Sequence, residues 1–450
     1  MPGARFALWR DRSLRFSMGA SATVLNGLTG ILRNKWFAQH LEASGIGILA
    51  QVVSSQMWLG TVAGMSLALP IARSVGAATG TGDWVRARRV VWAALTLLTM
   101  SASIVIALGL FFAPLISRAL LGSPQYASLI RICMVGVAGV AFQQLVVGIF
   151  AGRSDLKGPL AFSAVGGLAS VAATLYLVPR AGLGGAVFAV SILFPLGCLG
   201  AIVLRRKEYA SLLTRPGERA LTAGVAHGLL TVASSALVAA LVEQGVFLAI
   251  RSHYVRKFGI EANGFLQAGL GISQQVGSLF YAYLASYAFG RISGAAGVAG
   301  TRDYTRKHWS ALMLLAAAAL VLTSLGAGPL LRLLYSHRFD PAQPLMGWAL
   351  VGEYGRIGLL TWALGSLPLG GARLWLPLAL IFPATLGLAY VICIASGAGI
   401  LSMPKAYAAA GLIAAVLVGM VMSRRGVTLG LRDMAVFSLG AAALVFLAAR

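Results

Sequence analysis

Apolar runs of about twenty residues recur along the whole of this 450-residue chain, separated by short charged or Gly- and Pro-rich stretches. A run of that length crosses the ~30 Å hydrocarbon core of a bilayer as an α-helix. Only 11% of the residues are charged, whereas soluble proteins carry about a quarter. No β-barrel alternation is visible, and helices satisfy their own backbone hydrogen bonds in lipid. The chain is therefore predicted to be an all-α polytopic membrane protein.

The limits of the apolar runs predict about twelve membrane-spanning helices. They are expected near residues 16–34, 46–70, 90–116, 128–151, 159–178, 184–204, 221–250, 263–289, 309–333, 345–368, 374–396 and 405–423. A further run at 434–449 is either another span or a surface helix, which allows a count of thirteen or fourteen.

The longest loop, 205–220, lies midway and predicts the domain organisation. It is expected to be a cytoplasmic linker between an N-terminal lobe of six spans, 1–204, and a C-terminal lobe of six spans, 221–423. Residues 424–450 form an extra C-terminal segment. No loop is long enough to fold into a separate catalytic domain, so the function is expected to lie within the helical bundle.

Basic residues concentrate in every second loop, and loops rich in Lys and Arg are typically cytoplasmic. This bias predicts a cytoplasmic N-terminus. The basic start of the chain lacks a short apolar core with a cleavage site, so it is expected to be a cytoplasmic tail. The topology explains most of the net charge of +24, and no nucleic-acid partner is expected.

Two pairs of segments indicate an internal repeat. "HLEASGIGI" (40–48) is similar to "GIEANGFLQ" (259–267), and "ARSVGAA" (72–78) is similar to "GRISGAA" (290–296), at offsets of 219 and 218 residues. A duplicated six-helix unit predicts two lobes related by a pseudo-twofold axis along the membrane normal, with a central cavity between them. The alternative is coincidence in a chain rich in Gly and Ala.

Several stretches resemble the motifs of Wzx-type flippases, which move lipid-linked oligosaccharides. "NKWFAQHLEASGIGILAQ" (34–51) resembles the family's K-x-x-A-x-x-L-G-x-x-G-x-G-x-x-x-Q stretch. "RSHYVRKFGIEANGFLQAGLGIS" (251–273) is similar to R…R…A-G-x-x-Q-A…I-S, "GRIS" (290–293) resembles P-R-L-S, and "ALVGEYGRI" (349–357) resembles L-I-G-D-x-x-R-I. The similarity is greatest to the branch that handles enterobacterial common antigen and O-antigen units.

This resemblance implies the fold of the multidrug/oligosaccharidyl-lipid/polysaccharide exporter superfamily. It also implies a substrate of undecaprenyl diphosphate carrying a glycan, moved from the inner to the outer leaflet of the bacterial inner membrane. Membrane lipids and other polysaccharide-assembly membrane proteins are the implied partners. The chain departs from the motifs at Leu41-Glu42, where the family has Leu-Gly, at Gly290 in place of proline, and at Glu353 in place of aspartate.

A flippase for a lipid diphosphate requires a hydrated cationic cavity, because even one charge at the bilayer centre costs ~2.5 kcal/mol or more. Arginine suits a diphosphate best, since its planar fork donates two parallel hydrogen bonds. Arg251 and Arg256 follow the seventh apolar run on the predicted outer side, and Arg33 and Lys35 end the first. These four cations either line the cavity or extend to the outer headgroups.

The tenth predicted span contains the pair Glu353 and Arg356, three residues apart on one helical face. Ionisable groups inside a membrane usually face a polar interior. Arg356 is a candidate for contact with phosphate or sugar, and Glu353 for proton or ion coupling; the alternative is a self-neutralised structural pair. Glu243, in the seventh span, is a second coupling candidate.

Neutral side chains complete the candidate site. Gln51 and Gln267 lie within the motif-like stretches, where their amides either bind sugar hydroxyls or bridge helices. Tyr281, Tyr283 and Tyr287 either stack on sugars or pack between helices.

No catalytic residues, cofactor or metal site are expected. The three cysteines and five histidines are scattered without ligand spacing, and no P-loop signature appears. Energy would then come from an ion gradient or the membrane potential. The function predicted is flipping of lipid-linked oligosaccharide by alternating access. The alternatives are a multidrug or cation antiporter of the same superfamily and a membrane enzyme of polysaccharide assembly.

Overall fold

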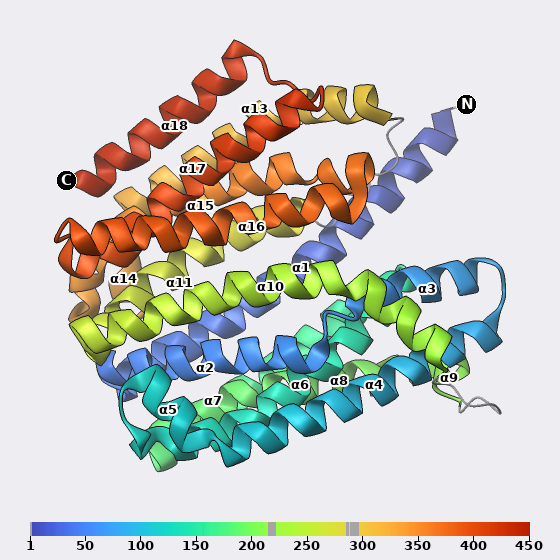
Figure 1. The fold of residues 1–450 in the computed structure, drawn as a ribbon, viewed down its shortest axis with the longest axis horizontal. Helices are drawn as coiled ribbons and strands as arrows, with labels where there is room; N and C mark the ends of the chain where they lie inside the picture. Colours follow the sequence, from blue (N-terminus) through green and yellow to red (C-terminus); the bar gives the residue numbers. More distant parts are fainter. Residues whose placement is uncertain (1, 156, 215–221, 285–287, 289–296) are drawn as a thin grey trace. The chain divides into compact units, whose positions relative to one another are not determined.

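The computed structural model describes residues 2–155, 157–214, 222–284, 288 and 297–450, and the described residues contain helices and no strand (Figure 1). The first half holds α1 (Pro2–His40), α2 (Glu42–Gly64), α3 (Ala68–Gly80), α4 (Trp84–Phe111), α5 (Ala113–Leu121), η1 (Pro124–Tyr126), α6 (Ala127–Gly152), α7 (Lys157–Ser191), α8 (Leu193–Leu204) and α9 (Arg206–Leu213). The second half holds α10 (Ala223–Phe258), α11 (Ile260–Tyr283), α13 (Gly297–Leu325), α14 (Ala327–Leu334), η3 (His337–Ala342), α15 (Gln343–Ala363), α16 (Ser366–Ala395), η4 (Gly399–Leu401), α17 (Ser402–Arg424) and α18 (Leu431–Ala449).

Nine helical segments of the described chain are long and apolar enough to cross a membrane. One of them, Lys157–Leu204, is 48 residues long and contains two of the predicted spans. The helices α1, α11 and α15 fall outside this set, and they carry most of the polar and charged candidates named above. The prediction of an all-α polytopic membrane protein is confirmed. The less apolar helices α1, α11 and α15 are the ones expected to carry function.

Two glycines turn the chain inside segments that are otherwise continuous helix. Gly182 in α7 has φ +52° and Gly371 in α16 has φ +59°, a conformation that glycine adopts without steric cost. The turn at Gly182 lets the long part of α7 pack against α8. Both turns fall between predicted spans, at 178–184 and 368–374.

The turn from α1 to α2 places a residue other than glycine in a left-handed conformation. Glu42 has φ +56°, the left-handed region that favours glycine, at the position where the Wzx motif has glycine. The corresponding turn from α10 to α11 uses Gly259, with φ +91°. The Glu42 carboxylate accepts a hydrogen bond from Arg338 Nη1 at 3.0 Å, so this exposed acid gains a surface ion pair.

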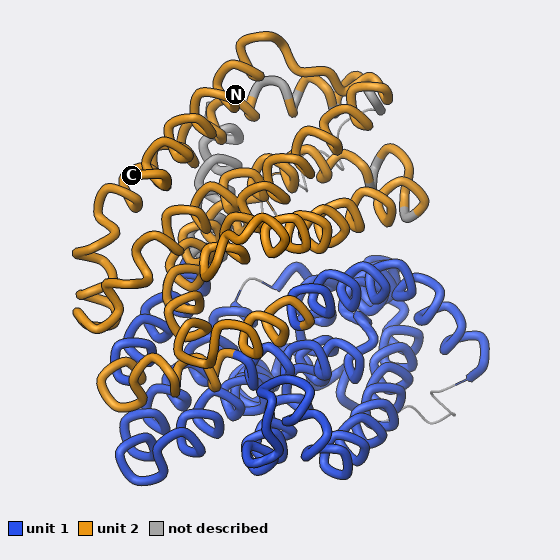
Figure 2. Tube along the Cα trace, turned by 60° about the vertical axis from the view of Figure 1, so that its left-hand side comes forward, with its two compact units in different colours: residues 1–36, 51–248 blue, residues 37–50, 249–450 orange. Residues whose placement is uncertain are grey.

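The chain forms two compact units (Figure 2). Unit 1 comprises residues 1–36 and 51–248, and unit 2 comprises 37–50 and 249–450. The core of unit 1 is built by α3, α4, α6 and α8, with buried residues such as Ile71, Val91 and Ile149. In unit 2, α15 is the central helix and packs against α11, α13, α16, α17 and α18.

The lobe limits expected from the sequence stay a prediction. The two compact units are defined by contacts between residues, whereas the predicted lobes follow the internal repeat. Most of α10, up to Leu248, belongs to unit 1, and the start of α2 belongs to unit 2. The predicted linker 205–220 contains α9. Residues 215–221 and the motif "GRIS" (290–293) lie outside the described residues.

The apolar run predicted at 434–449 forms α18, which packs along α13 and α15 of unit 2. Phe437 stacks on Tyr354 with ring centroids 5.3 Å apart. Asp433 accepts hydrogen bonds from Ser310 Oγ and from the Gly430 backbone nitrogen. The helix is therefore an integral part of unit 2, and it is long and apolar enough to span a membrane.

Candidate functional site

A buried carboxylate lies at the centre of unit 2. Glu353 of α15 is fully buried, and its two oxygens are each engaged by a tyrosine. Tyr281 of α11 donates to Oε1, and Tyr407 of α17 donates to Oε2 at 2.6 Å. Both carboxylate oxygens thus receive a hydrogen bond, as burial of such a group demands.

Arg356, one helical turn along α15, completes this cluster. Its Nη1 donates to the hydroxyl of Tyr407 at 3.1 Å, so one hydroxyl links the cation to the acid. The guanidinium also lies over the ring of Phe382, 4.8 Å from its centroid. Glu353, Arg356, Tyr281 and Tyr407 form the unit 2 charge cluster, and the sequence prediction that the acid and the arginine share a face agrees with this geometry.

Small residues allow the helices to approach closely enough to form the unit 2 charge cluster. A methyl group at Gly277 of α11 would lie 1.9 Å from Glu353 Oε1, so only glycine leaves room for the carboxylate. A methyl group at Gly352 would lie 2.2 Å from the Tyr407 ring, and one at Gly355 would lie 2.3 Å from the Gly411 carbonyl carbon. Glycine at helix contacts is typical of membrane bundles.

A second polar network in unit 2 holds Arg251. This arginine, near the end of α10, is 3% exposed. Its Nε and Nη2 both donate to Asn263 Oδ1, at 3.2 and 3.1 Å. Asn263 is fully buried, and its Nδ2 donates to the Gly47 carbonyl at 2.7 Å. Asn263 therefore joins α10 to the start of α2.

The same region contains a reciprocal glycine crossing between α2 and α11. A methyl group at Gly47 would lie 2.1 Å from the Ile260 carbonyl oxygen, and one at Gly264 would lie 1.8 Å from the Ala43 carbonyl oxygen. Gly47 and Gly264 are 217 positions apart, and so are Ala43 and Ile260. The glycines of the two motif-like stretches thus serve close backbone packing.

In unit 1, Arg33 of α1 contacts α7. Its Nη1 donates to Ser170 Oγ at 2.8 Å, and that hydroxyl donates to the Ala189 carbonyl at 2.6 Å. Ser170 is its one hydrogen-bond partner in the part of the chain that the structure describes, and its Nε is buried without a partner. A partly buried cation held by a neutral hydroxyl has capacity to bind an anion.

Unit 1 also buries neutral amides. Gln56 of α2 is fully buried, and its Oε1 accepts from Ser191 Oγ at 2.7 Å. A methyl group at Gly136 of α6 would lie 2.2 Å from the Gln56 amide carbon. Gln51 is likewise fully buried and donates to the Leu120 carbonyl at 3.4 Å, which ties α2 to α5.

The remaining predicted site residues are dispersed. Lys35 of α1 and Glu243 of α10 are half-buried within unit 1. Gln267 of α11 is half-buried in unit 2, and Arg256 is exposed at the end of α10. Among the predicted residues, the structure brings together Glu353, Arg356 and Tyr281.

Three residues that complete these networks were absent from the predicted site: Tyr407, Asn263 and Ser170. Asn263 lies inside the motif-like stretch "GIEANGFLQ", so its polarity in a buried helix was a usable signal. Tyr407 lies in the Ala-rich run "KAYAAAG", which gives no indication of a partner 54 residues away.

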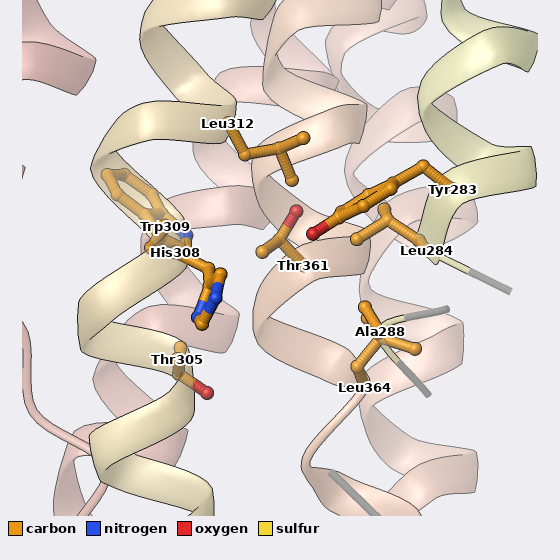
Figure 3. Close-up of a pocket in the computed structure, with 9 residues that line it drawn as sticks. All are labelled: Tyr283, Leu284, Ala288, Thr305, His308, Trp309, Leu312, Thr361 and Leu364. Carbon is orange, nitrogen blue, oxygen red and sulfur yellow. The ribbon is translucent and has the colours of Figure 1, made fainter. Parts of the chain in front are cut away.

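Unit 2 contains a small pocket between α11, α13 and α15 (Figure 3). Most of its lining is apolar, with Leu312, Leu364 and Trp309 among the walls. The hydroxyls of Thr361 and Tyr283 point toward one another across it (Figure 3). No group of three or more His, Cys, Asp or Glu among the described residues could hold a metal ion.

An ionised cluster joins the ends of α6, α7 and α9 in unit 1. Arg205 donates twice to Asp155, at 3.2 Å each, and Tyr209 donates to the same carboxylate. Asp155 also accepts from the Lys157 and Gly158 nitrogens at the start of α7. Burial alone would raise the pKa of Asp155, but the hydrogen bonds from Tyr209 and Arg205 outweigh it and lower the pKa below its usual value.

Comparison with curated proteins finds two lipid III flippases, from Escherichia coli (strain K12) and Shigella flexneri. Each is 23% identical to this chain over 362 residues, which is 79% of this chain and 82% of the relative. No family model matches the chain.

Solved structures share the fold. An inward-facing multidrug resistance MATE family transporter of the MOP superfamily superposes with a TM-score of 0.72 at 13% identity, covering 94% of this chain and 98% of that one. The lipid II flippase MurJ in an inward closed conformation also gives 0.72, at 14% identity over 96% of this chain and 91% of that one. The chain thus has the two-lobe helical fold of these transporters.

Proposed function

We propose that the protein is a flippase for undecaprenyl-diphosphate-linked oligosaccharide in the bacterial inner membrane. The observation that carries this proposal is the Arg33 guanidinium, partly buried in unit 1 with the neutral Ser170 hydroxyl as its hydrogen-bond partner. A cation left without a carboxylate in a membrane protein favours an anionic ligand, because burial of an uncompensated charge is costly. The similarity to lipid III flippases over most of the chain supports the same substrate class.

In this proposal, arginines hold the diphosphate. The principal candidates are Arg33 of unit 1, which donates to the Ser170 hydroxyl, and Arg251 of unit 2, which donates to the neutral Asn263 amide. Lys35, Arg256 and Arg356 supply further positive charge. Gln51 and Gln267 would bind sugar hydroxyls when the site is open.

Coupling to an ion gradient would fall to Glu353, with Glu243 as a second candidate. Glu353 is held by two hydroxyls and lies beside Arg356, so a change in its protonation would rearrange α11, α15 and α17 together. This arrangement disfavours an antiporter for cationic drugs, since both oxygens of the buried acid already accept hydrogen bonds from tyrosines within unit 2.

Depletion of the protein in its native cell tests the proposal. Undecaprenyl-diphosphate glycan is then assayed on each face of the inner membrane, and a complete repeat unit should accumulate on the cytoplasmic face. Complementation with Arg33→Ala should fail, with at least about tenfold slower flipping. Arg180→Ala should restore transport, because Arg180 is an exposed cation that lies over Tyr176.

The opposite outcome is equally concrete. If lipid-linked glycan stays evenly distributed after depletion while sensitivity to cationic drugs rises, the protein is an antiporter and the flippase proposal is wrong.

A further inference from the structure

Asn263 connects a cation to the backbone of another helix. Its amide oxygen accepts two hydrogen bonds from the Arg251 guanidinium, and its amide nitrogen donates to the Gly47 carbonyl. The orientation of the amide is fixed, because a guanidinium only donates and a carbonyl only accepts. Arg251 therefore holds Asn263 in the one orientation that can bind α2.

The segment attached in this way is the start of α2. Residues 37–50 belong to unit 2, whereas α2 from Gln51 onward belongs to unit 1. At the reciprocal glycine crossing, backbone touches backbone, so this end of unit 2 is closed between Gly47 and Gly264. The charge bias of the loops predicts that this end faces the periplasm.

The acceptor that Asn263 offers to Arg251 is neutral. A diphosphate carries about two negative charges, and charge-assisted hydrogen bonds are about twice as strong as neutral ones. A diphosphate within reach of Arg251 would therefore take the guanidinium from Asn263. Once the guanidinium has left, Asn263 no longer has the contact that orients its amide toward Gly47.

We infer that Asn263 is a positioning residue through which Arg251 latches the start of α2 closed until a diphosphate claims that arginine. This inference rests on the proposed function. Binding of the diphosphate and opening at the reciprocal glycine crossing would then compete for one side chain, and the empty protein would stay closed at this end.

The test measures access to the crossing in the full-length protein. Cys133, Cys198 and Cys393 are replaced by alanine, and Ala43, which is 7% exposed, becomes the single cysteine through Ala43→Cys. Labelling by a membrane-impermeant maleimide reports opening. In this background Asn263→Ala should raise the labelling rate about tenfold, because a buried hydrogen-bonded link is lost.

Two further variants complete the test. Ser278→Ala is the control, because Ser278 donates within the same helix, to the Gln275 carbonyl, and it should leave the rate unchanged. If Asn263→Ala does not fold, Arg251→Gln asks the same question and should also accelerate labelling. A rate within twofold of the parent in both latch variants would overturn the inference.

The ligand arm uses farnesyl diphosphate, inorganic diphosphate and farnesol. Farnesyl diphosphate should accelerate labelling of the parent and have no effect on Arg251→Gln. Acceleration by inorganic diphosphate alone would support the latch and show that the free anion is sufficient to release Arg251. The remaining outcome is that farnesol and farnesyl diphosphate accelerate labelling equally while Asn263→Ala is still labelled faster than the parent. That result would overturn the role of diphosphate as the trigger and count against the proposed function, but it would leave the latch in place.

Discussion

Each of the two units buries a polar side chain against a glycine, and in unit 2 that side chain is charged. In unit 1, Gln56 packs on Gly136 and shares a hydrogen bond with Ser191. In unit 2, Glu353 packs on Gly277 and accepts from Tyr281 and Tyr407. Both side chains pack against a glycine, but their chemistry differs. The Gln56 amide oxygen accepts from one hydroxyl, whereas the Glu353 carboxylate accepts from two and lies near a cation. Proton or ion coupling is therefore expected in unit 2.

The largest effect is expected from Arg356→Ala. Arg356 is linked to the buried Glu353 through the Tyr407 hydroxyl, and removal of the cation beside a buried acid typically costs ~3–5 kcal/mol, because the acid is left uncompensated. Thermal unfolding in detergent measures it. Lys405→Ala removes a cation of α17 that lies over Trp348 of α15, and it should cost about 1 kcal/mol or less. Equal losses in the two variants would show that Glu353 does not depend on Arg356.

Two reciprocal substitutions, a glutamate at Gln56 of unit 1 and a glutamine at Glu353 of unit 2, test the comparison directly. Gln56→Glu places a carboxyl where Ser191 is the hydrogen-bond donor, and it should destabilise the protein by roughly 3 kcal/mol. Glu353→Gln should cost only about 1 kcal/mol, since its amide keeps one acceptor oxygen. It should nevertheless abolish gradient-driven flipping. Chemical denaturation and a flipping assay on both variants decide the matter, and full transport by Glu353→Gln would remove Glu353 from the coupling role.

Methyl insertion compares the two glycines. Gly277→Ala and Gly136→Ala both overpack a buried polar group, and such insertions cost ~1–3 kcal/mol. Gly277→Ala should lie at the upper end, because the carboxylate cannot move without loss of the tyrosine hydrogen bonds. The unfolding midpoints of the two variants give the order, and a greater loss in Gly136→Ala would contradict it.

The smallest effect is expected at Asp155 of unit 1, which lies in the loop between α6 and α7. Asp155→Ala removes a helix-capping carboxylate and should cost ~1 kcal/mol near neutral pH. The pKa of Asp155 is lower in the folded state, so its contribution is present above the unfolded pKa of about 4 and is lost as the pH falls through the folded value. The difference between wild type and variant should shrink in acid, and a difference independent of pH would contradict this account.

Helix type and approximate span limits could be predicted from the sequence, because hydrophobic length is set by the bilayer alone. The i, i+3 spacing of Glu353 and Arg356 also predicted a shared face. The partners of these residues could not be predicted: Tyr407 lies 54 residues from Glu353, and only the packing of α15 on α17 brings the two together.

Arg251 illustrates the limit in another way. Its charge and position predicted a role in phosphate binding, but its hydrogen-bond partner depends on where Asn263 meets α10 and on the approach of α2. The stretches "HLEASGIGI" and "GIEANGFLQ" resemble flippase motifs in sequence. The structure gives them a physical role, since Gly47 and Gly264 allow contact between two helix backbones.

The reciprocal glycine crossing has an evolutionary consequence. Two surfaces that contact each other through the same residues in exchange are the signature of a twofold homodimer. Identical chains in a homodimer must change both sides of such a contact at once, whereas within one chain Gly47 and Gly264 can change separately. Gly136 and Glu353 are also 217 positions apart, and the second carries a charge that the first lacks.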